Sequence, residues 1–347
     1  MLKFKLSGRP QSFTKTTHTD VYPAVSPSYA LAGAASNLTG SVVITGSGRG
    51  IGRSTAHAFA QAGAPRIVIT ARSALELDEV EASITRGNEN VEIIKVVADI
   101  SNEHDVSKIF KAAGEVEVLM NNAGAFEGLK RFAESDPKDW FRTWDVNVKV
   151  GLFSLNDGIT TEDHILQGTY LATREFLKQI EAKPRASPVT IINTSSMGSV
   201  LIAPHFSACN PSKSALNRFT ELTHYEYPET VRAFAYHPGG VNTRIADGLG
   251  VDVSQYLTDS PELAAGFALW SATQSSADFL RGRFSSCKWV SKDDIDFHKS
   301  AIITTGSQDI DELLAKREEI VREGLLFTVV RGQEPSRVYC TISTIGE

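Results

Sequence analysis

From residue 41 onward, short apolar runs alternate with segments in which apolar residues recur at helical spacing. The apolar runs predict strands at 41–45, 66–70, 91–99, 116–124, 188–196 and 231–240, and the helical spacing predicts helices at 53–63, 74–86, 103–113 and 211–226. Strands that alternate with helices of about 10–15 residues are typical of βαβ units and a parallel sheet covered on both faces. Right-handed crossovers then predict a doubly wound α/β fold of the Rossmann type.

The first 40 residues lack this periodicity and are rich in Ser, Thr, Pro and Ala. Such a composition predicts a loosely ordered N-terminal arm. We expect one domain over residues 41–332 and a tail at 333–347. The length of 347 residues and the 41% hydrophobic content are enough for one large core, and they exclude a collagen-like or disulfide-stapled chain.

The charge balance restricts the partners. With 35 Lys and Arg against 41 Asp and Glu, the net charge is −6, so the chain lacks the basic footprint that binds nucleic acid or anionic lipid. No apolar run approaches the roughly 18 residues of a membrane span, and the N-terminus does not resemble a secretory signal. Three cysteines without metal-ligand spacing (Cys209, Cys287 and Cys340) suit a reducing cytosol. We therefore expect a cytoplasmic protein that binds no metal.

A glycine-rich segment, TGSGRGIG at 45–52, lies between the first predicted strand and the first predicted helix. Glycines there permit a tight turn and a close approach of backbone to a pyrophosphate, which the amide groups and dipole of the helix N-terminus attract. The alternative is a purely structural turn. The candidate cofactor-binding residues of this segment are Gly46, Ser47, Arg49, Gly50, Ile51 and Gly52.

The end of the second strand bears on the choice of dinucleotide. An Asp or Glu there would bond the ribose 2′-hydroxyl and repel a 2′-phosphate, but the strand ends Thr70-Ala71-Arg72. Arg72 and Arg49 could both bind a 2′-phosphate through charge-assisted hydrogen bonds, or could simply be solvated surface cations. The sequence thus favours NADP over NAD.

Together with this loop, three further motifs give the chain a family resemblance. TGxxxGxG at 45–52, Asp99 after the third strand, NNAG at 121–124 and PGGVNT at 238–243 resemble the short-chain dehydrogenases/reductases, in the single-domain branch and most like fungal members. The resemblance implies hydride transfer between NADP(H) and a small alcohol or carbonyl substrate, and a homo-oligomer (dimer or tetramer) formed through the fourth and fifth helices. The further cofactor-binding residues that it implies are Asp99, Asn122, Ala123, Gly124, Lys213, Pro238, Gly239, Val241 and Thr243.

The resemblance also implies catalytic roles. Ser196 matches the family's carbonyl-polarising Ser, Lys213 the Lys that holds the ribose and lowers the pKa of a catalytic Tyr, and Asn147 the Asn that positions a water relay. The Tyr itself is missing. The family pattern YxxxK places it four residues before Lys213, where this chain has Cys209.

A thiol is a poor replacement for a phenol because of its reach. Its ordinary pKa is about 8.5, and the neighbouring Lys213 should lower it. However, a general acid must lie within hydrogen-bonding distance of the oxygen that it protonates, and the short Cys209 side chain could do so only through a water. Loss of a positioned acid typically lowers the rate roughly 10²–10⁴-fold. His205 could stand in, or be an ordinary loop residue. The chain could also be an NADP-binding pseudoenzyme, with Cys209 inert, or a non-functional gene product.

Two segments interrupt the family pattern. Residues 150–167 split the fourth helix, and deleting them joins DVNVK directly to GTYLATREFL; residues 290–308 separate a strand end from a helix start. The two segments have 18 and 19 residues, and both begin with Val and end with Gln. An intron read in frame begins with a Val codon and ends with a Gln codon, so both could be retained introns. The alternative is two genuine surface insertions, which loops tolerate well.

Overall fold

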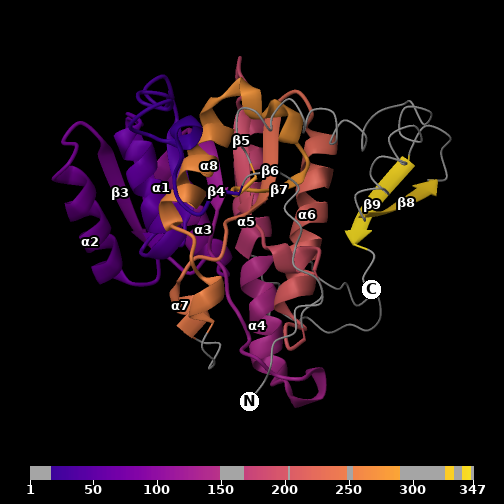
Figure 1. Ribbon diagram of the computed structural model, residues 1–347. Helices are drawn as coiled ribbons and strands as arrows, with labels where there is room; N and C mark the ends of the chain where they lie inside the picture. The colour runs from indigo at the N-terminus through magenta and orange to yellow at the C-terminus, as the bar shows by residue number, and fades with distance from the viewer. Residues whose placement is uncertain are drawn as a thin grey trace, which may run out of the picture. The chain divides into compact units, whose positions relative to one another are not determined.

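Seven short strands form one parallel sheet in the computed structural model, in the order β3-β2-β1-β4-β5-β6-β7 (Figure 1). Residues 17–148, 168–201, 204–247, 253–289, 325–331 and 338–344 are described. The strands of the sheet are β1 (Ser41–Thr45), β2 (Arg66–Ala71), β3 (Glu92–Val97), β4 (Val116–Asn121), β5 (Val189–Thr194), β6 (Val231–His237) and β7 (Phe284–Ser286). The strand order reverses between β1 and β4, so the predicted doubly wound α/β fold is confirmed.

Helices connect the strands close to where the apolar spacing predicts them. They are α1 (Gly50–Gln61), α2 (Ala74–Thr85), α3 (Glu103–Ala113), α4 (Pro137–Asn147), α5 (Gly168–Ala182), α6 (Cys209–Glu226), α7 (Arg244–Asp247) and α8 (Pro261–Thr273), with 3-10 turns at Pro23–Val25, Phe132–Glu134, Met197–Ser199, Ser254–Tyr256 and Ser275–Leu280. Side-chain caps fix several helix starts: Ser73, Asn102 and Ser260 each accept a hydrogen bond from an amide of the following first turn.

Alternation along the strands divides the core between the two faces of the sheet. One side carries Val43, Val68, Leu119 and Ile191, which cluster with residues of α3 and α5. The intervening residues of β1 and β2, such as Ile44 and Ile67, are also fully buried and point to the opposite side. Both faces are therefore covered, as the continuous apolar strands predict.

The N-terminal segment differs from the predicted loose arm where the structure describes it. Between residues 18 and 40, Val25, Leu31 and Ala35 are fully or almost fully buried. The Ala35 amide donates to the Ala62 carbonyl at the end of α1 (3.0 Å), and a Cβ added to Gly266 of α8 would collide with the Val25 carbonyl. A few widely spaced apolar residues thus dock this segment without any periodic signal; residues 1–16 lie outside the described part.

The predicted boundary between 41–332 and 333–347 lies outside the described residues and stays a prediction. Residues 18–288 form one compact unit, and residues 1–17 with 289–347 belong to a second unit. Within the second unit, β8 (Leu325–Arg331) pairs antiparallel with β9 (Val338–Thr344). The predicted insertion at 290–308 lies outside the described residues.

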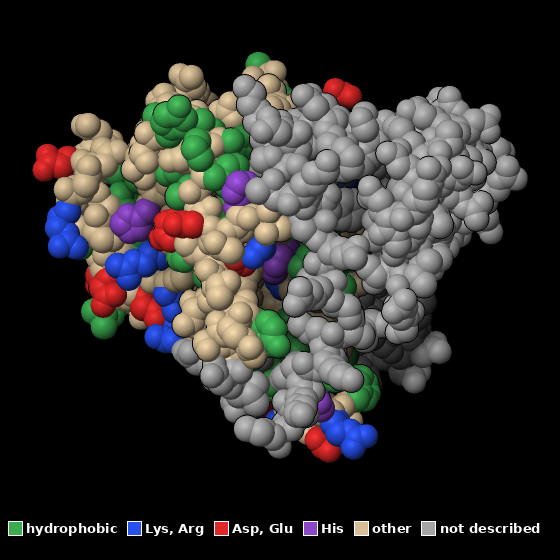
Figure 2. All heavy atoms as spheres, viewed as in Figure 1, with side chains coloured by type: hydrophobic (Ala, Val, Ile, Leu, Met, Phe, Trp, Pro, Cys, Tyr) green, Lys and Arg blue, Asp and Glu red, His purple; other side chains and the backbone are tan. Residues whose placement is uncertain are grey.

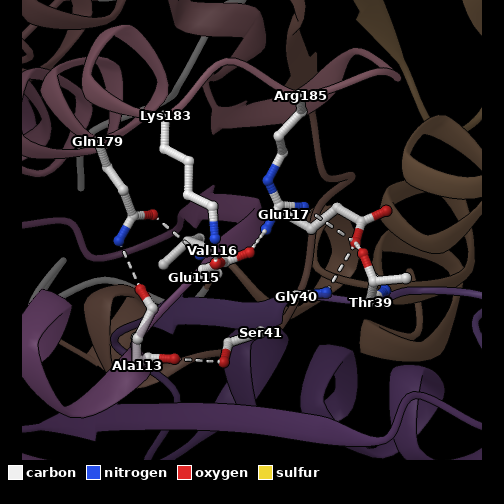
Figure 3. A network of polar contacts seen from close by, with 11 residues as sticks. Thr39, Gly40, Ser41, Ala113, Glu115, Val116, Glu117, Gln179, Lys183 and Arg185 are labelled. Carbon is white, nitrogen blue, oxygen red and sulfur yellow. Dashed lines mark hydrogen bonds and ion pairs between the residues drawn. The ribbon is translucent and has the colours of Figure 1, made fainter.

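A polar network fixes the amino-terminal ends of the central strands (Figure 3). The Glu117 carboxylate accepts hydrogen bonds from the Thr39 and Gly40 amides (both 2.8 Å) and from Arg185 (3.3 Å). Ser41 donates to the Ala113 carbonyl (2.6 Å). These contacts align β1 with β4 at one edge, and so align their opposite ends, where ligands bind in folds of this kind.

Charged side chains of both signs are interspersed around α2 on the face shown in Figure 2. Exposed ion pairs include Lys95 with Asp78 (2.7 Å) and Arg66 with Glu92 (2.7 Å). Exposed pairs of this kind contribute about 0–1 kcal/mol each, so they shape solubility more than stability. Among the helices that the structure describes, none is long and apolar enough to cross a membrane.

Helices α4 and α5 meet end to end, although 18 residues of insertion separate them in the sequence. The Thr169 hydroxyl donates to the Asn147 carbonyl (3.0 Å), and a Cβ added to Gly168 would collide with the Val146 carbonyl oxygen. If residues 150–167 were absent, Gly168 and Thr169 would be the fourth residues after Val146 and Asn147. A Thr hydroxyl bonded to the carbonyl four residues earlier is a standard helix contact. The contacts are those of one helix, and they fit a retained intron and a genuine insertion equally well.

Deleting residues 150–167 is therefore expected to stabilise the protein. Closing a loop of this length costs on the order of 2 kcal/mol, so the deletion should raise the melting temperature by several degrees in a thermal unfolding scan. Replacing 150–167 with a Gly/Ser linker of equal length is the control and should leave the melting temperature unchanged. Deleting both 150–167 and 290–308 should also promote dimers, measured by light scattering. A deletion protein that is less stable than the full chain would contradict the interpretation.

Candidate active site

The glycine-rich loop joins β1 to α1 with the close contacts that only glycine allows. Gly46 and Gly50 adopt positive φ angles of 66° and 53°. A Cβ on Gly46 would lie 2.9 Å from the Ala123 Cα, and one on Gly52 would collide with the Gly46 carbonyl. The loop therefore lies directly against the NNAG turn, and α1 begins at Gly50 with amide groups available to an anion. These residues fit a dinucleotide pyrophosphate.

Two of the predicted loop residues have roles within the protein. The buried Ser47 hydroxyl accepts a hydrogen bond from the Thr70 amide (2.7 Å), and the Ser47 amide donates to the Thr70 carbonyl (3.0 Å). Ser47 thus attaches the loop to β2. Ile51 lies half-buried in the first turn of α1, where its carbonyl accepts from Thr55.

Thr45, which the motif contains but our site prediction omits, holds the loop to the end of β4. Its hydroxyl oxygen accepts hydrogen bonds from the Asn122 and Ala123 amides (2.9 and 3.0 Å). In return, the Asn122 side chain donates to the carbonyls of Thr45 and Gly46 (3.0 and 3.2 Å). Asn122 and Ala123 therefore define the floor of the site through the backbone, at the switch point between β1 and β4. Gly124 follows, and a Cβ added to it would lie 3.5 Å from the Asn147 side-chain oxygen.

The predicted 2′-phosphate site contains an acid that the sequence analysis missed. Arg72 is exposed and follows β2, but Arg49 forms an ion pair with Glu76 of α2 (2.9 Å), and Arg244 approaches the same carboxylate (3.4 Å). A Cβ on Gly48 would lie 2.8 Å from Glu76 Oε2. Because the second strand ends without an acid, the sequence predicts no carboxylate near these arginines. That prediction is wrong, because the first turn of α2 returns to the loop and brings Glu76 beside it.

Asp99 lies after β3, and its carboxylate is already hydrogen-bonded within the protein. Oδ1 accepts from the Ser101 amide (2.9 Å) and the Ser101 hydroxyl (2.6 Å), while the Asp99 amide donates to Asp105 (3.0 Å). The side chain is half-buried, and its second oxygen remains for a ligand.

The residues after β6 form the opposite side of the site. Pro238 precedes Gly239, which has a φ of 88°. The Gly240 amide donates to the buried Asp259 (2.6 Å), and Asp259 also forms an ion pair with Lys288. Val241 bridges to Asp259, and the Thr243 methyl lies 3.3 Å from the Cβ position of Gly50. The PGGVNT segment thus reaches across to the glycine-rich loop.

Ser196 lies just after β5, and Lys213 contacts the last residue of the same strand. Lys213 is buried on α6, and its ammonium donates to the Thr194 carbonyl (2.7 Å). Burial lowers the pKa of Lys213. Ser196 is half-buried and caps the turn at 197–199, accepting from the Gly198 amide (3.1 Å). The neighbouring Ser195 hydroxyl is buried and donates to Asn217 (2.6 Å), so Ser196 is the serine that remains accessible.

Asn147, at the end of α4, connects three elements of the site. Its Oδ1 accepts from the Ala125 amide (2.9 Å), and its Nδ2 donates to the Ala125 carbonyl (3.2 Å) and to the Ser212 hydroxyl (2.9 Å). The backbone carbonyl accepts from Thr169. The structure thus brings Asn147 to the same α6 that carries Lys213.

Cys209 is the first residue of α6, one turn before Lys213. Burial raises the pKa of the thiol to about 11, an effect that Glu127 reinforces and Lys213 only partly offsets. Our expectation that Lys213 would lower the pKa below its ordinary value is wrong, because desolvation outweighs the attraction of the ammonium group. The thiol is therefore neutral near pH 7 and is no stronger an acid than a phenol.

Two other titratable groups lie near the predicted site. His205, the possible stand-in, occupies the turn before α6 with a φ of 72°. His237 ends β6, where its Nδ1 accepts from the Met197 amide (3.3 Å), and burial lowers its pKa to about 3. Within the described ranges, no three His, Cys, Asp or Glu residues are grouped so that they could hold a metal ion.

Glu127 is the second carboxylate that the sequence analysis missed. It lies three residues after the NNAG turn, is only 9% exposed, and accepts hydrogen bonds from the Ala208 and Cys209 amides (2.7 and 3.2 Å). No spacing rule pairs residue 127 with residue 209. The sequence offers only a weak signal, an acidic residue shortly after the NNAG motif at 121–124.

Comparisons with known proteins agree with this geometry. The family model for short chain dehydrogenases matches residues 41–253. A short chain dehydrogenase of Monascus purpureus, mpl6, is 35% identical over 314 residues, covering 88% of this chain and 92% of the relative. Another, andI of Emericella variicolor, is 29% identical over 332 residues, covering 92% and 97%.

Solved structures show the same fold. A 3-oxoacyl-[acyl-carrier protein] reductase from Brucella melitensis with bound NAD has a TM-score of 0.61 and 22% identity, over 79% of this chain and all of that one. A short chain dehydrogenase from Shigella flexneri complexed with NADP has a TM-score of 0.60 and 18% identity, over 73% and 98%. Because the family model matches residues 41–253 and a relative is 35% identical over most of the chain, the chain belongs to the short-chain dehydrogenase family, an oxidoreductase family with a Rossmann-type nicotinamide dinucleotide site.

Proposed function

We propose that the protein is an NADP(H)-dependent oxidoreductase that interconverts a small alcohol and its carbonyl compound. The observation that carries the proposal is the anchoring of Lys213 and Asn147 around α6. Lys213 donates to the Thr194 carbonyl, two residues before Ser196, and Asn147 donates to Ser212, the neighbour of Lys213. The nicotinamide supplies or accepts the hydride when it is bound. The Ser196 hydroxyl would donate to the substrate oxygen, because Ser195 is committed to Asn217.

Lys213 has the position to hold the cofactor ribose. Its ammonium group has one hydrogen bond, to Thr194, and an ammonium carries three donors. Asn147 fixes the segment that begins at Ala125 against α6, so the floor of the site is rigid before any ligand binds.

The proposed preference for NADP(H) now depends on four charged side chains. Arg72 is exposed, and no described residue forms an ion pair with it. Arg49 is paired with Glu76, which Arg244 also approaches, so two guanidinium groups share one carboxylate. A 2′-phosphate would compete with Glu76 for Arg49, and Arg244 could keep Glu76 paired during that exchange.

The missing phenol supports a second candidate function. Cys209 has a neutral, half-buried thiol, so the chain could retain NADP(H) with little turnover, as a binding protein. A gene product without function is the third possibility. Cofactor binding and turnover distinguish these alternatives.

We also propose that the protein is a cytoplasmic homo-oligomer, a dimer or tetramer, that associates through α4 and α5. Large apolar side chains are exposed on these helices, with Phe141 55% and Tyr170 41% exposed. Its only other ligands would be the cofactor and a small carbonyl or alcohol substrate.

Cofactor titrations test the charge argument. NADPH should bind at least tenfold more tightly than NADH, about 1.4 kcal/mol, when measured by quenching of intrinsic fluorescence. Arg72→Asp should reverse the preference, because it places a carboxylate where the 2′-phosphate would lie. Glu76→Gln should tighten NADPH and leave NADH unchanged. Arg86→Asp, at the other end of α2, is the matched control; equal affinities of the unchanged chain for both cofactors would contradict the preference.

Restoring the phenol tests the catalytic assignment. Cys209→Tyr should raise kcat for carbonyl reduction by a factor of roughly 10²–10⁴, with NADPH affinity nearly unchanged, because proton donation is felt in the transition state. Cys209→Phe is the matched control, since it fills the same space without a hydroxyl, and it should not raise kcat. If the unchanged chain already turns over at several per second and Cys209→Tyr changes nothing, the assignment of Cys209 to the acid position is wrong.

A further inference from the structure

The buried carboxyl of Glu127 is held through only one of its two oxygens. Oε1 accepts from the Ala208 amide (2.7 Å) and the Cys209 amide (3.2 Å), so Glu127 caps the start of α6 from outside the helix. Oε2 is buried and has no hydrogen-bond partner among the described residues. A buried acceptor without a partner is destabilising, and more so when it is charged. Oε2 therefore suits a ligand that donates a hydrogen bond.

The surrounding segments place this carboxyl beside the vacant phenol position. Ala125 is bonded to the Asn147 side chain, and the ring of Phe126 lies 5.3 Å from that of Phe206, just before α6. Glu127 follows Ala125 and Phe126 in the chain, and its carboxyl group accepts a hydrogen bond from the Cys209 amide. Tyr would occupy position 209 in the family pattern, where this chain has the shorter Cys. A carboxyl group reaches further from its backbone than a thiol does.

We propose that Glu127 is the catalytic acid and base of this protein, in place of the missing phenol. The inference rests on the proposed oxidoreductase function. In alcohol oxidation, the O–H bond of the substrate breaks and its proton moves to Glu127 Oε2. The C–H bond breaks at the same carbon, its hydrogen and electron pair pass to the oxidised nicotinamide, and the C=O bond forms. Carbonyl reduction reverses each transfer, with Glu127 returning the proton.

The cap on α6 is compatible with both protonation states. When Oε2 carries the proton, Oε1 is a carbonyl oxygen and still accepts from Ala208 and Cys209. When the proton leaves, the same two amides and the positive end of α6 stabilise the carboxylate. Proton transfer at Oε2 therefore does not break the contacts that position the group.

A purely structural cap is the alternative, and a double-mutant cycle separates the two roles. The substrate is any carbonyl compound that the Cys209→Tyr variant reduces with NADPH. Glu127→Gln retains a carbonyl oxygen for the two amides but cannot transfer a proton. In the unchanged chain it should lower kcat at least tenfold. In the Cys209→Tyr background, where the phenol donates the proton, it should change kcat by less than about threefold. Glu134→Gln, on an exposed residue of the same loop, should have no effect in either background.

A measurement without cofactor or substrate tests the placement of the charge. The charged neighbours that act on the Cys209 thiol are Glu127, which raises its pKa, and Lys213, which lowers it. Glu127→Gln should therefore lower the thiol pKa from its value of about 11, followed by the ultraviolet absorbance of the thiolate, whereas Glu134→Gln should not.

Three results would overturn the role of Glu127: an equal loss of kcat in both backgrounds, no turnover by the unchanged chain on a substrate that Cys209→Tyr reduces, or an unchanged thiol pKa in Glu127→Gln. Failure of the proposed function is different. In that case the Cys209→Tyr variant would neither quench its fluorescence with NADPH nor reduce any carbonyl compound, and the role of Glu127 would fall with it.

Discussion

The candidate site depends on how the ends of β1 and β4 are joined. One hydroxyl, that of Thr45, accepts from the Asn122 and Ala123 amides, and the Asn122 side chain returns two hydrogen bonds to the carbonyls of Thr45 and Gly46. Because these two strands lie where the sheet order reverses, their side-by-side ends create the crevice in which a dinucleotide binds. The glycine contacts around the crevice follow from this closeness, since any Cβ on Gly46 or Gly52 would push the strand ends apart.

The N-terminus of α6 is the second fixed point, and it explains the unusual chemistry of Cys209. A helix start inside a protein leaves amide donors that need partners. Here Glu127 supplies the acceptor, and its charge combines with burial to keep the thiol neutral. Lys213, one turn later, lowers the pKa of the thiol but only partly offsets the effect of burial. The same carboxyl thus stabilises the helix and makes Cys209 unsuitable as a thiolate.

Much of this structure could be predicted from the sequence, because strand and helix periods and the glycine-rich loop are local signals. The strand at 41–45 and the helix at 103–113 have the predicted bounds. What could not be predicted depends on long-range geometry. Glu76 reaches the cofactor loop only because α2 packs back against it, and the pKa of Cys209 depends on burial. The docking of Val25 and Leu31 has no periodic signal at all.

The contacts of Asn147 explain how the site could tolerate residues 150–167 beside it, if they are a genuine insertion. The side chain of Asn147 is fixed by Ala125 and Ser212, and its carbonyl by Thr169, so every contact that orients it comes from the packed core. The covalent link between Asn147 and Gly168 contributes connectivity but none of these contacts. Side chains held by tertiary contacts stay in place when the chain between two stacked helix ends is lengthened, because the cost is mainly loop entropy, which grows slowly with length. The geometry of a catalytic residue can therefore be preserved even where the continuity of its helix is lost.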